Sequence, residues 1–131
     1  MGWRRSCAAS LGGEIVKLEG PGKALNIFIT EDDRWQGKPL HEQVLRKAHE
    51  AGLAGGTSIQ GLMGFGASSH LHDAYIEVLM TNLPMSVLIV DSPEKIDRFL
   101  PELREMVGAS LIETWNVNVE FYRHGKGGET P

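Results

Sequence analysis

The 131-residue sequence lacks the features that would place it at once in several classes of protein. Its single cysteine, Cys7, excludes an intrachain disulfide framework and a cluster of thiolate metal ligands. No apolar run approaches the roughly 18 residues that a helix needs to cross a bilayer. The net charge of -4 gives no basic excess of the kind that marks nucleic-acid-binding proteins. We therefore expect a cytoplasmic protein whose partners do not include nucleic acid.

The composition is that of one soluble globular domain, because 41% of the residues are hydrophobic and 23% are charged. Residues 17–124 are predicted to form this domain. Residues 1–16 are interpreted as a disordered or mis-annotated extension. They are not read as a signal peptide, because their apolar part is shorter than the about 7 to 15 residues of a signal-peptide core. Residues 125–131 are predicted to be a flexible tail.

Hydrophobic periodicity predicts two helices, over residues 39–51 and 93–107, and several strands. The second helix contains Pro101, which is expected to kink or split it. The predicted strands are residues 23–30, 57–60, 73–80, 85–90 and 114–122. Asp91 is interpreted as a capping residue at a helix start, and Trp115 and Phe121 as core residues of the sheet.

The order of these elements is read as β-α-β-β-α-β, the α+β, ferredoxin-like arrangement with both helices on one face of a sheet. A sheet of about four strands then has a second face without cover. Self-association is the simplest way to cover that face, so the sequence predicts an oligomer.

Residues 60–72 hold the densest group of candidate binding residues. Glycines at three positions allow unusual backbone conformations or the close approach of a ligand, and serines and histidines follow them. The candidates are Gly61, Gly64, Phe65, Gly66, Ser68, Ser69, His70 and His72. The alternative is a hairpin loop in which glycine merely permits turns and the histidines are solvated. Residues 62–71 are predicted to be poorly ordered without a ligand, because glycine raises the entropy lost on fixing a loop.

No catalytic or metal site is predicted. Ser68 and Ser69 lie close to His70 in the sequence, but residues so close together rarely meet in triad geometry, and no supporting acid is placed. His70 and His72 supply two imidazoles without a third ligand. Residues 31–33 are interpreted as a solvated acidic loop rather than a site for a hard cation. The sequence thus predicts no catalytic residue, no metal and no cofactor.

Several short motifs occur in one order and with one spacing. They include Glu31-Asp32-Asp33, Gly37-Lys38-Pro39-Leu40, Ala51-Gly52-Leu53-Ala54-Gly55-Gly56-Thr57, Gly61-Leu62-Met63-Gly64-Phe65-Gly66 and Ile89-Val90-Asp91. Any one of these motifs is weak, but together they are specific. Over roughly residues 17–123 the sequence resembles the bacterial and archaeal PII-like family known as domain of unknown function 190.

The resemblance implies a ferredoxin-like protomer of a homotrimer that transduces a signal, with no established catalysis. It implies a small effector, such as an adenine nucleotide, bound between protomers near the base of the loop from Gly61 to His72. The turn at Gly108 would form another wall of that cleft, and Arg123-His124-Gly125 would correspond to the tail of PII proteins. Gly108, Arg123 and His124 therefore join the candidate ligand-binding residues. The regulated partner would be a membrane transport protein such as a fluoride channel.

A small hydrolase or metal-binding protein of the same fold stays open as an alternative. For an anionic effector, Gly64 and Gly66 would offer backbone N–H groups, and Arg123, His124 and Lys126 would supply positive charge. The base of the loop and the tail, from one protomer or from two, are predicted to bracket one cleft.

Overall fold

The computed structural model describes residues 4–7, 16–65, 72–73 and 83–124. In these residues the chain forms helices α1 (Leu40–Glu50) and α2 (Pro93–Met106). The strands are β1 (Arg4–Cys7), β2 (Val16–Thr30), β3 (Arg34–Trp35), β4 (Lys38–Pro39), β5 (Gly56–Gln60), β6 (Met63–Gly64), β7 (His72–Asp73), β8 (Pro84–Asp91), β9 (Leu111–Val119) and β10 (Arg123–His124).

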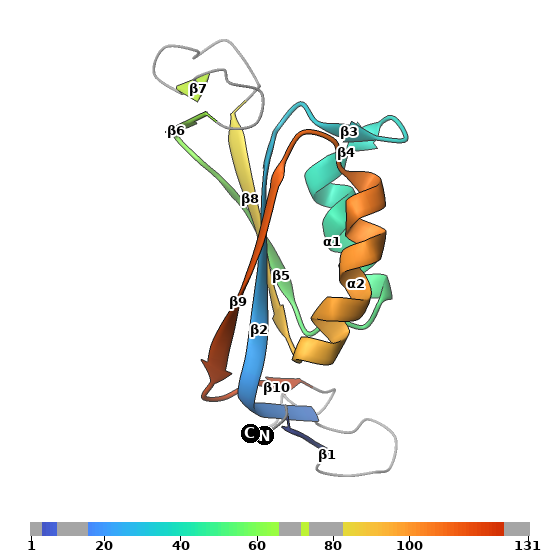
Figure 1. Cartoon of the computed structure of the whole chain (residues 1–131), viewed down its shortest axis with the longest axis vertical. Helices are drawn as coiled ribbons and strands as arrows, with labels where there is room; N and C mark the ends of the chain where they lie inside the picture. The colour runs from blue at the N-terminus through green and yellow to red at the C-terminus, as the bar shows by residue number, and fades with distance from the viewer. Residues whose placement is uncertain (1–3, 8–15, 66–71, 74–82, 125–131) are drawn as a thin grey trace.

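The main sheet has the strand order β9-β2-β8-β5, with every neighbouring pair antiparallel. β2 pairs with β8 along one side and with β9 along the other. Both helices lie on one face of this sheet (Figure 1). The succession β2, α1, β5, β8, α2, β9 confirms the predicted ferredoxin-like fold. The third strand of that succession is β8, while most of the strand predicted over 73–80 lies outside the described residues.

The hydrophobic core lies between the sheet and the two helices. Alternate residues of β2 and β8 face the helices, because successive side chains of a strand point to opposite faces. Each helix covers them with a stripe of apolar residues spaced three or four positions apart. The buried core residues are Leu25, Ile27, Ile29, Leu40, Val44, Ala48, Leu53, Met85, Val87, Ile89, Ile96, Phe99, Leu103 and Met106. No helix in the described part of the chain is long and apolar enough to span a membrane.

The start of α2 differs from the prediction in its capping residue. Ser92 is the N-cap, since its hydroxyl accepts a hydrogen bond from the N–H of Lys95 at 3.3 Å. Asp91 is instead buried, with 1% of its surface exposed, and accepts a hydrogen bond from the N–H of Ala54 at 2.8 Å. The helix runs through Pro101 to Met106 as one element, so the expected split is not found.

β2 is much longer than the predicted strand, and its first residues belong to a second set of pairings. Residues 16–19 pair with β1, and residues 16 and 17 also pair with β10. Gly20, with φ of 101°, directly follows these residues and is the first residue of β2 that pairs with β9 in the main sheet. β1 falls within the residues predicted to be an extension, and the boundaries of the domain stay a prediction.

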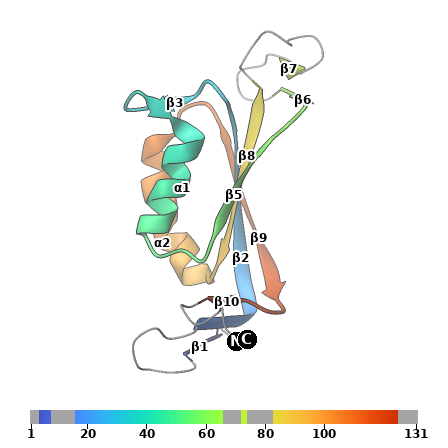
Figure 2. The ribbon, with the colours of Figure 1, turned by 180° about the vertical axis from the view of Figure 1, so that it is seen from behind.

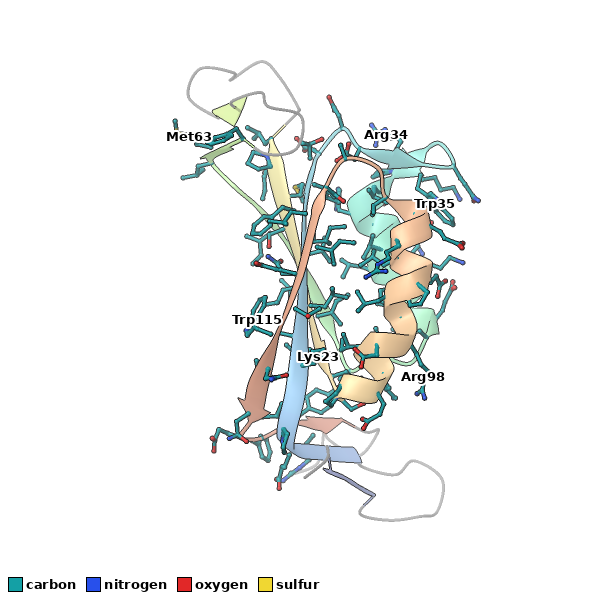
Figure 3. All side chains as sticks on the ribbon, in the orientation of Figure 1. Lys23, Arg34, Trp35, Met63, Arg98 and Trp115 are labelled. Carbon is teal, nitrogen blue, oxygen red and sulfur yellow. The ribbon has the colours of Figure 1, made fainter. Side chains whose placement is uncertain are left out.

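The face of the sheet away from the helices carries apolar side chains, most of them exposed. We call this the outer face and define it by the exposed Phe28, Ile59, Leu111 and Trp115 and the partly buried Leu88. Trp115 is 43% exposed and points away from the helices (Figure 3), so its assignment to the core was wrong.

The register of β9 is the reason for the misplaced tryptophan. Thr114 lies opposite the buried Leu25, so Thr114 is on the helix side and its neighbour Trp115 is on the outer face. Phe121, also expected in the core, follows the end of β9 and is largely exposed.

Candidate functional site

Gly61 directly follows the last residue of β5, and it packs tightly against Pro84. Its N–H donates a hydrogen bond to the carbonyl of Pro84 at 2.7 Å. A Cβ added to Gly61 would lie 3.0 Å from Cγ of Pro84, whereas one added to Gly64 would lie 3.4 Å from the same atom. Neither glycine has a positive φ. At Gly61, close packing therefore accounts for the absence of a side chain, in place of the unusual backbone that the sequence suggested.

The stretch that follows places large apolar side chains in solvent. Leu62 is 79% exposed and Phe65 is 77% exposed. Gly64 lies in β6 and pairs with His72 of β7. The remaining candidates of this loop, and most of the stretch predicted to be poorly ordered, lie outside the described residues. These candidates are Gly66, Ser68, Ser69 and His70.

The turn after α2 borders a cavity of about 420 Å³. The cavity lies between α2 and the helix side of β9, and Gly108 is one of its lining residues. A Cβ added to Gly108 would have no neighbour within 4 Å, so the turn is open at that point. The other lining residues are Leu100, Arg104, Val107, Ser110, Ile112 and Thr114. This volume lies within the range of small-molecule sites.

Arg104 and Thr114 are lining residues that the sequence did not single out. Arg104 lies in the last turn of α2, four residues before Gly108, and its side chain is exposed. It lies outside the buried stripe of α2, and nothing in the sequence placed Thr114 beside it. The only available signal was a basic residue one turn before a candidate glycine.

Gly61 and Gly108 lie at the same end of the sheet but on opposite edges. Gly61 follows β5, and Gly108 precedes β9, which are the two edge strands of the main sheet. Both connections lie at the end where β2 reaches Thr30 (Figure 1). One chain alone therefore does not bring these two candidates together.

Arg123 and His124 lie at the other end of the molecule. They form β10 and pair with Lys17 and Val16 of β2, far from β6 in both views (Figures 1 and 2). The guanidinium of Arg123 lies over the ring of Phe121, 5.2 Å from its centroid. Within one chain, the tail and the glycine loop do not bracket a cleft, so only the version of that prediction that uses two protomers remains.

A second cavity, of about 350 Å³, lies near the start of β5. Ala54 lines this cavity and bonds to two other segments of the chain. Its N–H donates to the carboxylate of Asp91, and its carbonyl accepts from the hydroxyl of Tyr122 at 2.8 Å. Burial raises the pKa of the Tyr122 phenol above its ordinary value, and the nearby carboxylate of Asp91 raises that pKa further. This network holds the segment after β9 against the turn between α1 and β5.

The acidic loop that follows β2 has structural contacts. The carboxylate of Asp33 accepts a hydrogen bond from the N–H of Thr30 at 2.8 Å, and the carboxylate of Glu31 accepts one from the amide of Gln60 at 3.4 Å. Among the residues that the structure describes, no three His, Cys, Asp or Glu side chains gather as ligands for a metal.

Comparison with known proteins identifies relatives over most of the chain. The model of the family DUF190, described as an uncharacterized ACR, matches residues 22–119. A UPF0166 protein of Aquifex aeolicus (strain VF5) is 38% identical over 82 residues, which cover 63% of this chain and 78% of the relative. A UPF0166 protein of Methanocaldococcus jannaschii is 31% identical over 85 residues, which cover 65% of this chain and 78% of the relative.

Among solved structures, a similar chain is that of CPII, a nitrogen regulatory PII-like protein from Thiomonas intermedia K12, bound to ADP, AMP and bicarbonate. The two chains are 17% identical with a TM-score of 0.48, and the match covers 75% of this chain and 89% of the other. The family match spans most of the described domain and agrees with the motifs of the sequence. The chain belongs to the DUF190 (UPF0166) family.

Proposed function

We propose that this protein is a PII-like signal-transduction subunit, a homotrimer that binds a small effector between protomers and regulates a partner protein. The observation that carries the proposal is the outer face of the sheet. Large apolar side chains from β2, β5 and β9 stand exposed on it. Because contiguous exposed apolar surface is uncommon on a monomer, a second copy of the chain is the simplest cover.

The polar groups near the centre of the outer face are compatible with burial by another chain. Asn26 is already buried in the monomer, and its side-chain oxygen accepts a hydrogen bond from the hydroxyl of Ser86 at 2.6 Å. Its amide nitrogen donates to the carboxylate of Glu113 at 3.3 Å. Since these groups have partners within the chain, covering Asn26 and Ser86 would leave few unsatisfied hydrogen bonds.

The positions of the candidate residues support an effector site between protomers. Gly61 and Gly108 lie at the same end of the sheet but at its two edges. A neighbouring protomer that brings its β5 edge toward the β9 edge would assemble both walls of one cleft. The exposed side chains of Leu62 and Phe65, next to this cleft, would then offer a contact surface to the regulated protein. A membrane transport protein, such as a fluoride channel, is the partner we propose.

Light scattering combined with a thermal-shift panel tests the proposal. The full chain should have a mass of roughly 43 kDa, from three chains of 14.4 kDa. One member of a panel of adenine nucleotides, cyclic nucleotides, bicarbonate, fluoride and divalent metals should raise the melting temperature. A ligand at about 100 times its dissociation constant adds about 2.7 kcal/mol to the free energy of unfolding.

Two results would contradict the proposed function. A monomer at micromolar concentration would remove the inter-protomer cleft. Turnover of a panel member would point to the enzyme alternative.

A further inference from the structure

We infer that the cavity between α2 and β9 binds a small ligand in which an anionic head is joined to a flat apolar body, and that Arg104 holds the head. The inference rests on the proposed function, because it names the chemical class of the effector and the residue that binds its charge. It adds Arg104, which the sequence had not singled out, to a turn at Gly108 that was already a candidate.

The charge of Arg104 is available to a ligand. Among the described residues that line the cavity, Arg104 is the one charged side chain. It makes no ion pair or hydrogen bond with any residue that the structure describes. Glu102, two positions earlier on α2, instead lies 3.8 Å from the ammonium of Lys47. A guanidinium presents several N–H donors in a planar fork that matches the oxygens of a phosphate or a carboxylate.

The remaining polar groups of the cavity suit the same head group. Ser110 and Thr114, which carry hydroxyl groups, line the cavity together with Arg104. The Ser110 hydroxyl has only a long bond, of 3.4 Å, to the carbonyl of Gly108, so it can rotate toward a ligand. Gly108 has open space where a side chain would be, which lets a ligand approach the backbone of the turn.

The other walls of the cavity are apolar and define the second half of the ligand. Leu100 and Val107 from α2 and Ile112 from β9 line it, and all three are partly buried. A planar ring or hydrocarbon body placed on these side chains would remove apolar surface from water. The volume of about 420 Å³ accommodates such a body together with its head group.

The test is an NMR titration of the full-length protein with phenyl phosphate, benzoate and phenol, following the backbone amides. Phenyl phosphate and benzoate present a phosphate and a carboxylate on the same ring, and phenol presents no charge at neutral pH. We expect the amides of Gly108, Ser110 and Thr114 to move with at least one anionic probe and not with phenol. The probe that binds more tightly identifies the preferred head group.

Matched arginine variants separate binding from the structural role of a basic residue at a helix C-terminus. Arg104→Ala should weaken binding about tenfold or more, the scale of a hydrogen bond to a charged group. Arg98→Ala removes an exposed arginine from the same helix, outside the cavity (Figure 3), and should leave the affinity unchanged. Arg104→Lys should retain part of the affinity, because the charge stays while the fork is lost.

Three results would overturn the inference: amides of the cavity that do not move, phenol that binds as tightly as the anionic probes, or Arg104→Ala with the affinity of the parent. Its failure differs from failure of the proposed function. A trimer stabilised by a panel ligand equally in the parent and in Arg104→Ala would keep the function and reject this site. A monomer that still binds phenyl phosphate through Arg104 would keep the site and reject the function.

Discussion

Gly61 is a residue whose role the contacts explain without a ligand. A Cβ at this position would meet the rigid ring of Pro84 at 3.0 Å, and a proline ring has little freedom to give way. Gly61→Ala should therefore lower the free energy of unfolding by about 1 to 3 kcal/mol, the usual cost of overpacking. Urea denaturation of the parent and the variant measures this difference.

Gly55→Ala is the matched control for this prediction. Gly55 directly precedes β5, as Gly61 directly follows it, and a Cβ at Gly55 would have no neighbour within 4 Å. Its substitution should leave stability unchanged or slightly raise it, because alanine restricts the unfolded chain more than glycine does. Equal stability losses in the two variants would refute the packing explanation for Gly61.

Tyr122 makes the stability of the protein fall as the pH becomes alkaline. Burial, with the Asp91 carboxylate as a second cause, raises the folded-state pKa of Tyr122 above the value of about 10 in the unfolded chain. The contribution of the neutral phenol is therefore fully present below about pH 10 and is lost as the pH rises through the folded-state pKa. The parent should thus lose stability above about pH 10 more steeply than Tyr122→Phe does.

Urea denaturation at a series of pH values checks this prediction. Near neutral pH, Tyr122→Phe should be less stable by about 0.5 to 1.5 kcal/mol, because it lacks the hydrogen bond to Ala54. The gap between the two proteins should narrow as the pH rises above about 10. A gap that stays constant across this range would mean that the phenol titrates as in the unfolded chain.

At the scale of elements, the start of α2 depends on the hydroxyl of Ser92. Ser92→Ala should cost about 1 kcal/mol of stability, because the N–H of Lys95 loses its acceptor. Ser110→Ala, in the turn after the same helix, removes a hydroxyl that makes only a 3.4 Å bond and should cost less. Thermal or urea unfolding compares the two variants, and a larger loss for Ser110→Ala would contradict the capping role.

The elements themselves could be predicted because their apolar residues follow one period without ambiguity. Leu25, Ile27 and Ile29 alternate along β2, and the single buried stripe of α2 continues on both sides of Pro101. β9 was harder, since apolar residues occur on both of its faces. Only the pairing of Thr114 with Leu25 decides that Trp115 faces outward, and pairing is a property of two strands.

The candidate site could be predicted only where one segment supplies it. The turn at Gly108 became a candidate through the family resemblance, and a cavity lies beside it. Arg104 was missed because its environment depends on β9, which is distant in the sequence. Asp91 was misread for the same reason, since its partner Ala54 is 37 positions away and a helix start beside it offered a simpler role.

For the whole molecule, the outer face predicts how copies of the chain associate. Trp115→Lys places a charge on this face and should reduce the mass in solution from roughly 43 kDa toward that of one 14.4 kDa chain. Phe65→Lys is the control, because Phe65 is 77% exposed and lies outside the outer face. Light scattering on both variants, with circular dichroism to confirm folding, measures the effect. A folded Trp115→Lys that keeps the mass of the parent would place the interface elsewhere.

The central position of β2 also fixes the order in which the sheet can be completed. Both neighbours of this early strand in the main sheet come late in the chain, and its residue Asn26 meets Glu113 across 87 positions. Long loops must close before these pairings stabilise anything, so stopped-flow refolding should proceed in milliseconds to seconds rather than microseconds. Until then, both edges of residues 20–30 of β2 are unpaired, and a chain halted at that stage offers another chain the same hydrogen bonds that β8 and β9 will later make.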